Sequence, residues 1–267
     1  MMGPDRTPAP VLPREVRPYL RELVRRTRAV YGSDLVGVFA VGSLALGDYR
    51  HGRSDIDITV VVDAAAPTAA RHELAAAVRH PGLRCPATGL ELVVYDADFA
   101  GSPSPAAGYL LNLNTGPLLP PVADFESAGS PGFWYAIDRA IGHQSGVSLF
   151  GRPVREVLAP PALPDLLGAV SDSVREHASG AGHLADNRVL NGCRTVVFCR
   201  TGRWTAKSEA GRLIAAAEAE FRGLVEAALR SVDRPRAQAL ALPADGVGAF
   251  LSWVRGVVAG TLRDSAG

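Results

Sequence analysis

Apolar residues recur in the first half of the chain as short runs of strand length, with segments of helical spacing between them. From Arg14 to Tyr31 the apolar positions are three and four residues apart, which predicts an amphipathic helix. A continuous apolar run within 34–41 and two mainly apolar runs over 56–62 and 90–95 predict strands, and the alanine-rich stretch 68–79 predicts a helix. This alternation of strands and helices predicts an α/β domain.

The second half of the chain has helical periodicity beyond a proline-rich segment. Residues 100–132 are dense in Gly, Pro, Asn and Ser and predict long irregular connections, after which Trp134 to Ser148 predicts a helix. Closely spaced prolines between 153 and 164 predict a linker, because such prolines cannot continue a helix or a central strand. We therefore predict two domains, 1–158 and 159–267, the second a helical bundle with helical segments over 166–183, 186–200, 207–231 and 246–262.

Composition narrows the class of protein. Hydrophobic residues make up 47% of the 267 residues, enough for a full core, and a net charge of +1 provides no basic field to hold a polynucleotide. No apolar stretch reaches the length of a membrane span and the start has no signal-peptide pattern, so we expect a cytoplasmic protein that binds neither membranes nor nucleic acid. The three cysteines show no CxxC spacing, which indicates neither a disulfide framework nor a zinc site.

The stretch from Gly42 to Ile58 carries the strongest chemical signal. A buried strand ends in Gly42-Ser43, and eleven residues then separate Ser43 from Asp55, which opens the next strand as Asp55-Ile-Asp57. Residues two apart in a strand face the same side, so both carboxylates project into one space. Two like charges so close require a cation, and oxygen ligands suit Mg²⁺. A solvated strand end is the alternative explanation of an Asp-x-Asp pair, since aspartate also favours turns.

Glu91 lies in the middle of the third predicted strand, between apolar neighbours. A lone carboxylate in such a run is costly unless it is paired or bound to a metal. If this strand lies beside the strand of Asp55 and Asp57, Glu91 completes a three-carboxylate metal cluster, opposite backbone N–H groups and hydroxyls at Gly42-Ser43 that can cradle phosphate oxygens.

These residues resemble those of the nucleotidyltransferase superfamily, which is related to the DNA polymerase beta fold. The helical half is similar to that of the aminoglycoside 3''-adenylyltransferases, which confer resistance to streptomycin and spectinomycin. The segments that carry this second similarity run from Asn187 to Arg194, from Thr201 to Ala210, from Tyr109 to Pro117 and from Leu149 to Pro153.

The resemblance implies a Mg²⁺-dependent transfer of AMP from ATP to a hydroxyl of a small polar acceptor, with an aminoglycoside or aminocyclitol antibiotic as the acceptor class. It implies that Gly42, Ser43 and Ser54 contact the ATP phosphates, that Asp55 and Asp57 hold the metal, and that Glu91 is the general base. From the helical half, Arg194 and Lys207 would reach the nucleotide. Lys207 is also the only lysine among 28 basic residues, as expected where a compact charge on a phosphate is needed.

The acceptor side departs from the resemblance. Gly116 stands where the streptomycin enzymes have a drug-packing tryptophan, and their acidic drug contacts have no clear counterpart; the candidates that remain are Asn112, Asp186 and Asn187. Two alternatives stay open. One is a transferase acting on a biosynthetic metabolite or a protein hydroxyl, and the other is a nucleotide-binding module without turnover. We expect a monomer.

Overall fold

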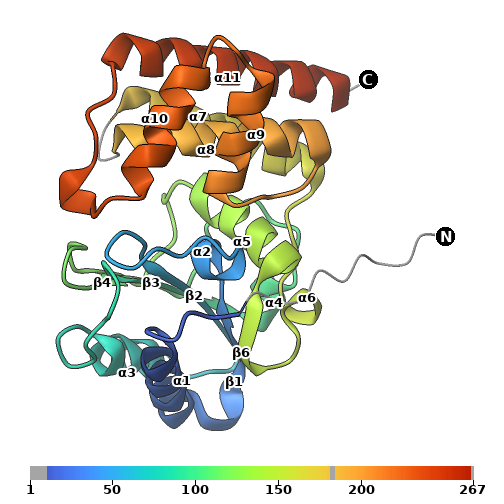
Figure 1. The fold of residues 1–267 in the computed structure, drawn as a ribbon. Coiled ribbons are helices and arrows are strands. Elements are labelled where there is room, and N and C mark those ends of the chain that lie inside the picture. Colours follow the sequence, from blue (N-terminus) through green and yellow to red (C-terminus); the bar gives the residue numbers. More distant parts are fainter. Residues whose placement is uncertain (1–10, 181–183, 266–267) are drawn as a thin grey trace.

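The computed structural model describes residues 11–180 and 184–265. Its first part is a mixed sheet flanked by helices, and helices α7 to α11 stack on one side of that part (Figure 1). The predicted fold class, an α/β domain followed by a helical region, is confirmed. Most of the proline-rich start, residues 1–10, and the end of the helix predicted over 166–183 lie outside the described residues.

The sheet has six strands in the order β5-β4-β3-β2-β1-β6. Strands β2 and β3 pair in parallel, whereas each of the other neighbouring pairs is antiparallel. Three of the strands match the predicted runs closely: β1 (Leu35–Ala40), β2 (Ile56–Val62) and β3 (Leu90–Asp96).

Side chains alternate between the two faces of the sheet. Ile56, Ile58 and Val60 of β2 are fully buried or nearly so, and they pack in one cluster with residues of α1 (Arg17–Tyr31) and α3 (Thr68–Val78). Asp57 and Thr59 therefore point to the opposite face, toward the helical region. Burial of the isoleucines fixes the direction of the carboxylate.

Three strands were missed by the periodicity. Within the stretch predicted to be irregular lie β4 (Leu111–Thr115) and β5 (Val122–Asp124). The predicted helix 134–148 is α5 (Phe133–Ser145), and its last predicted turn instead begins β6 (Val147–Gly151), which pairs with β1. Pairing with the sheet satisfies backbone groups that local sequence leaves undecided, and this explains the errors.

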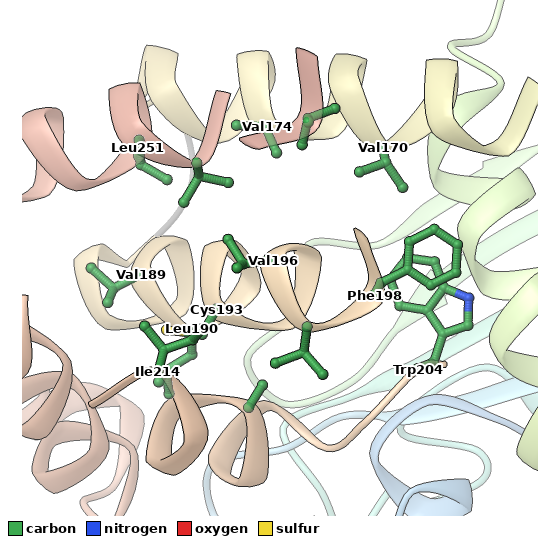
Figure 2. Packing of buried hydrophobic residues seen from close by; sticks show 14 of the residues in the cluster. Val170, Val174, Val189, Leu190, Cys193, Val196, Phe198, Trp204, Ile214 and Leu251 are labelled. Atoms are coloured by element: carbon green, nitrogen blue, oxygen red, sulfur yellow. The ribbon is translucent and has the colours of Figure 1, made fainter. Parts of the chain in front are cut away.

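The helical region has its own apolar core. Val189, Cys193 and Val196 of α8 form its centre, between α7 and α11 on one side and α9 on the other (Figure 2). Phe198 stacks on Trp204 at 4.1 Å between ring centroids. The helices are α7 (Leu163–Ser179), α8 (Ala185–Thr201), α9 (Lys207–Ala217), α10 (Arg222–Val232) and α11 (Ala244–Ser265).

The segment predicted as one helix over 207–231 is two helices, α9 and α10. Glu218 leaves helical geometry although no Gly or Pro stands between the two helices, and Phe221 is buried in the helical core. The break allows both helices to pack on α8, which decides against a single straight helix.

Helix α5 lies between the two parts. Ala136, Ile137 and Ala140 belong to the core of the helical region, although α5 precedes the predicted boundary at 158/159. That boundary falls between α6 (Val154–Val157) and α7 and stays a prediction. Two further short helices, α2 (Gly42–Ala45) and α4 (Ala97–Ala100), follow β1 and β3.

All three cysteines are free thiols, two of them buried. Among the described residues, no helix combines the length and apolarity needed to cross a bilayer.

Candidate active site

A cleft of about 570 Å³ lies between the sheet and the helical region. Its walls bring together nearly all of the predicted site residues: Gly42, Ser43, Ser54, Asp55, Asp57, Glu91, Asn112, Asn187, Arg194 and Lys207. These residues come from both halves of the chain, so the cleft exists only because the halves pack together.

The floor of the cleft is a polar row that crosses three strands. Asp57 on β2 is in register with Glu91 on β3, and Glu91 is in register with Asn114 on β4. The neighbouring register row on the same face lies two residues further along β2 and β3 and also lines the cleft; it consists of Thr59, Val93 and Asn112. The parallel pairing of β2 with β3 thus places Glu91 beside Asp57, which is the condition on which the sequence grouped these carboxylates.

Gly42 lies directly against Asp57. A Cβ atom at Gly42 would stand 1.9 Å from Asp57 Oδ2, and the residue has a φ of +56°. Only glycine fits both the backbone conformation and the close approach. Gly42, directly after β1, therefore leaves the space that the Asp57 carboxylate occupies.

Burial and neighbouring carboxylates raise the pKa of Asp57 and of Glu91. Burial, followed by the charges of Asp55 and Glu91, raises the pKa of Asp57 well above its ordinary value. Burial and the charge of Asp55 raise the pKa of Glu91 to about 8. Both acids carry a charge poorly without a nearby cation, which is the electrostatic condition of a cation site.

The oxygen donors fit Mg²⁺ better as a pair than as a triad. No group of three His, Cys, Asp or Glu side chains in the described parts of the chain is arranged to hold a metal ion by itself. The three-carboxylate metal cluster predicted from Asp55, Asp57 and Glu91 is therefore not preformed. Mg²⁺ commonly takes one or two carboxylates and completes its shell with phosphate oxygens and water, and Asp55 with Asp57 meets that requirement.

Two hydroxyls stand beside the carboxylates. Ser43 Oγ is buried and has no hydrogen-bond partner among the described residues, which is costly unless a ligand supplies one. Ser54 Oγ accepts a hydrogen bond from the backbone N–H of Arg50 at 3.0 Å, so its own proton stays available. Both are suited to anionic oxygen atoms.

The opposite wall presents two cations. Lys207, the first residue of α9, donates from Nζ to Asn187 Oδ1 at 2.8 Å. Burial and the neighbouring charge of Arg194 lower the pKa of Lys207, and the carboxylates of Asp55 and Asp57 oppose that shift. Burial likewise lowers the pKa of Arg194.

A chain of hydrogen bonds orients Arg194. His177 Nδ1 lies 2.7 Å from the carbonyl oxygen of Ser173, which can only accept, so Nδ1 carries the proton. In the neutral ring Nε2 then accepts from Asn191 Nδ2 at 2.9 Å, and Asn191 Oδ1 accepts from Arg194 Nη2 at 3.0 Å. Trp204 lies under the guanidinium group, with its ring centre 5.7 Å from Arg194 Cζ.

The structure differs from the sequence reasoning at Asp186. Its side chain is fully buried and holds Arg53 Nη2 at 2.7 and 2.6 Å from its two oxygens, so it does not line the cleft as the predicted acceptor contact would. The sequence alone could not reveal that a basic residue 133 positions earlier takes up this carboxylate. Asn112 and Asn187 do line the cleft.

Sequence reasoning also missed several residues of the cleft wall, of which three bear on its chemistry. Asp138 and Trp134 lie four residues apart on one face of α5, and Asn114 follows Asn112 on β4. Burial raises the pKa of Asp138 to about 6, against the attraction of Arg194 and Lys207. The alternation Leu-Asn-Leu-Asn over 111–114 was the available signal for Asn114, whereas nothing in the sequence showed where α5 would point.

Comparison with known proteins agrees with this geometry. Residues 19–82 match the family model of a nucleotidyltransferase domain. That match spans α1 to α3 and includes Gly42, Ser43, Asp55 and Asp57. The chain thus folds as a nucleotidyltransferase α/β domain followed by a helical region.

The arrangement of both parts resembles that of a solved structure, the spectinomycin adenyltransferase AAD(9) from Enterococcus faecialis with ATP and spectinomycin. The TM-score is 0.66 at 16% identity, over 91% of this chain and 98% of that chain. At this identity the likeness concerns the fold. No curated protein sequence matches the chain.

Proposed function

We propose that this protein transfers AMP from ATP to a hydroxyl group of a small polar acceptor, with release of pyrophosphate. The observation that carries the proposal is the row Asp57–Glu91 on adjacent parallel strands, facing Lys207 and Arg194 across one cleft. Carboxylates on one wall and cations on the other are what a metal-bound polyphosphate requires.

Asp55 and Asp57 would hold Mg²⁺, which would supply positive charge to offset that of the polyphosphate. Ser43 would donate to a phosphate oxygen, since its buried hydroxyl otherwise lacks a partner among the described residues. Lys207 and Arg194 would neutralise the charge of the departing pyrophosphate. Each role matches a charge or a polar atom that the protein alone leaves poorly satisfied.

Glu91 would act as the general base. It takes the proton of the acceptor hydroxyl while the hydroxyl oxygen forms a bond to the α-phosphorus and the bond from that phosphorus to the β-phosphate oxygen breaks. A pKa raised to about 8 in the metal-free protein supports this role, since a base works best when its pKa lies near the working pH. A cation held by Asp55 and Asp57 would favour the ionised form of Glu91, the form that can take the proton.

For the acceptor we propose an aminoglycoside or aminocyclitol. The cleft offers such a molecule the amides of Asn112 and Asn114, the carboxylate of Asp138 and the ring of Trp134. Amides bind hydroxyls, and a carboxylate beside an aromatic ring suits an amine. The likeness to a spectinomycin adenyltransferase supports the same acceptor class.

The test measures pyrophosphate release from ATP and Mg²⁺ over a panel that includes streptomycin, spectinomycin and other aminoglycosides. We expect acceptor-dependent release with the wild type and about 10²- to 10⁴-fold less with Glu91→Gln, which keeps the shape of the side chain but cannot take the proton. Glu156→Gln, at an exposed glutamate on α6, is the matched control and should leave the rate unchanged.

Two results would count against the proposal. Failure of every acceptor to release pyrophosphate, with ATP and Mg²⁺ still bound, would favour a nucleotide-binding module or a different acceptor. Unchanged transfer in Glu91→Gln would remove this residue from the chemistry.

A further inference from the structure

The loop between α2 and β2, residues 47–54, contacts the helical region through three charged side chains. We call it the connecting loop. Asp48 bonds to the start of α9, Arg50 forms an ion pair with Asp233 after α10, and Arg53 forms an ion pair with Asp186 on α8. The same loop joins Ser43 to Asp55 along the chain, so it also connects two of the proposed site residues.

Asp48 caps a helix that belongs to the other half of the protein. Its Oδ2 accepts from the Ser208 N–H at 3.1 Å and its Oδ1 accepts from Ser208 Oγ at 2.6 Å. Helix α9 has no side-chain cap of its own at Ala206. A carboxylate satisfies the free N–H groups at a helix N-terminus and also fixes where the helix begins. Here the first helical residue is Lys207.

Arg53 is connected to Lys207 through hydrogen bonds made by Asp186 and Asn187. It binds Asp186, which also accepts hydrogen bonds from Ser231 Oγ and from the Asn187 N–H. Asn187 in turn accepts from Lys207 Nζ at 2.8 Å. One contact of the connecting loop therefore holds the backbone at Ser208, next to Lys207, and the other holds Asn187, the side-chain partner of the Lys207 ammonium group.

The burial of this second contact indicates a role beyond stability. Asp186 is 0% exposed and the Arg53 side chain 10%, and Arg53 Nη1 is buried without a hydrogen-bond partner among the described residues. A buried ion pair with an unsatisfied nitrogen contributes little net stability, because the loss of hydration opposes the attraction. What such a pair does provide is a fixed geometry between the segments that carry it.

We propose that the connecting loop positions Lys207 against the carboxylates of the sheet, with Asp48, Arg53 and Asp186 as positioning residues. The inference rests on the proposed function, in which Lys207 contacts the nucleotide phosphates. It assigns to Asp186 a role different from acceptor binding. It also explains how two halves joined by one chain crossing can present a single phosphate site.

The first experiment needs no nucleotide. Amide hydrogen exchange is measured for the wild type and for Arg53→Met, Asp186→Asn and Asp48→Asn. We expect faster exchange of the Ser208 amide and of the connecting loop in all three variants. Asp172→Asn, which breaks an exposed ion pair with Arg175 on α7, is the matched control and should leave these amides unchanged. Wild-type protection at Ser208 in both Arg53→Met and Asp48→Asn would overturn the proposal.

The second experiment measures affinity for ATP with Mg²⁺ by calorimetry. Arg53→Met and Asp48→Asn should raise Kd by about fivefold or more, the usual lower range for coupling between sites. The double variant Arg53→Met/Asp186→Asn should bind ATP no more weakly than the weaker-binding of the two single variants, because the two residues act as one unit.

A readout in the Lys207→Ala background separates positioning from general damage. There Arg53→Met should change Kd by less than twofold, since the group that it positions is gone. An undiminished effect of Arg53→Met in that background would overturn the proposal. If Asp186→Asn fails to fold, Arg53→Met and Asp48→Asn still decide. If the wild type binds no ATP, the proposed function fails, while the exchange data still report whether the loop holds α9.

Discussion

Substitution of Gly42 by alanine tests directly whether the close contact between Gly42 and Asp57 matters for activity. The added methyl group would stand 1.9 Å from Asp57 Oδ2 and 2.6 Å from its Cγ. Ordinary contacts of a carbon atom are about 3.5 Å, so the carboxylate or the strand end must retreat by roughly 1.6 Å. Asp57 is buried against this residue in the cleft floor, and its retreat takes a proposed metal ligand out of place.

The magnitude follows from two separate effects. A positive φ costs a non-glycine residue about 1–2 kcal/mol, which corresponds to a fall in Tm of roughly 2–4 °C per kcal/mol in a protein of this size. The displaced carboxylate adds a loss of rate, since a misplacement of about 1 Å at a reacting centre costs on the order of 10²-fold. We therefore expect Gly42→Ala to fold with a modestly lower Tm and to transfer AMP at least about 100-fold more slowly.

Gly202→Ala provides the matched control. Gly202 ends α8 with a φ of +68° and has no atom within 4 Å of its Cβ direction, so alanine there brings the backbone strain without the collision. Thermal unfolding and pyrophosphate release are measured for both variants. Equal rates in the two variants, at similar Tm, would show that the contact between Gly42 and Asp57 has no catalytic consequence and would refute the reasoning.

Three further predictions concern the charges of the cleft. Asp57→Asn removes a metal ligand and should lower turnover on the order of 10³-fold, with Tm in EDTA no lower than that of the wild type; near wild-type turnover would disprove the metal assignment. Lys207→Ala should weaken ATP binding in calorimetry by roughly 1.5–3 kcal/mol, the range for a charged hydrogen bond, and undiminished affinity would place the lysine outside the phosphate site. The raised pKa of Glu91, about 8 against an ordinary 4.5, means that the folded protein keeps a proton that the unfolded chain releases. In EDTA, the contribution of Glu91 to stability should therefore be fully present below pH 4.5 and be lost as the pH rises through about 8. Glu91→Gln should flatten this fall in thermal unfolding, and an unchanged slope would contradict the assigned shift.

Local sequence was sufficient to predict the central strands of the sheet and the acidic residues that they carry. The run Ile56–Val62 is β2 as predicted, because alternate isoleucines and valines leave only one way to bury the apolar face. That constraint also fixed the common direction of Asp55 and Asp57. Glu91 was recognisable because a carboxylate within a buried run needs a partner.

Which groups distant in the sequence come into contact depends on the packing of the helices and strands. Strands β4 and β6 exist because the sheet completes their hydrogen bonds, and α9 separates from α10 because both pack on α8. The sequence suggested Asp186 as an acceptor contact, whereas in the structure this residue forms an ion pair with Arg53. Nothing in the sequence indicated a site role for Asp138, which lines the cleft because of the orientation of α5. Periodicity records only how each segment divides between core and solvent, whereas ion pairs and clefts depend on how the segments pack, which no local pattern encodes.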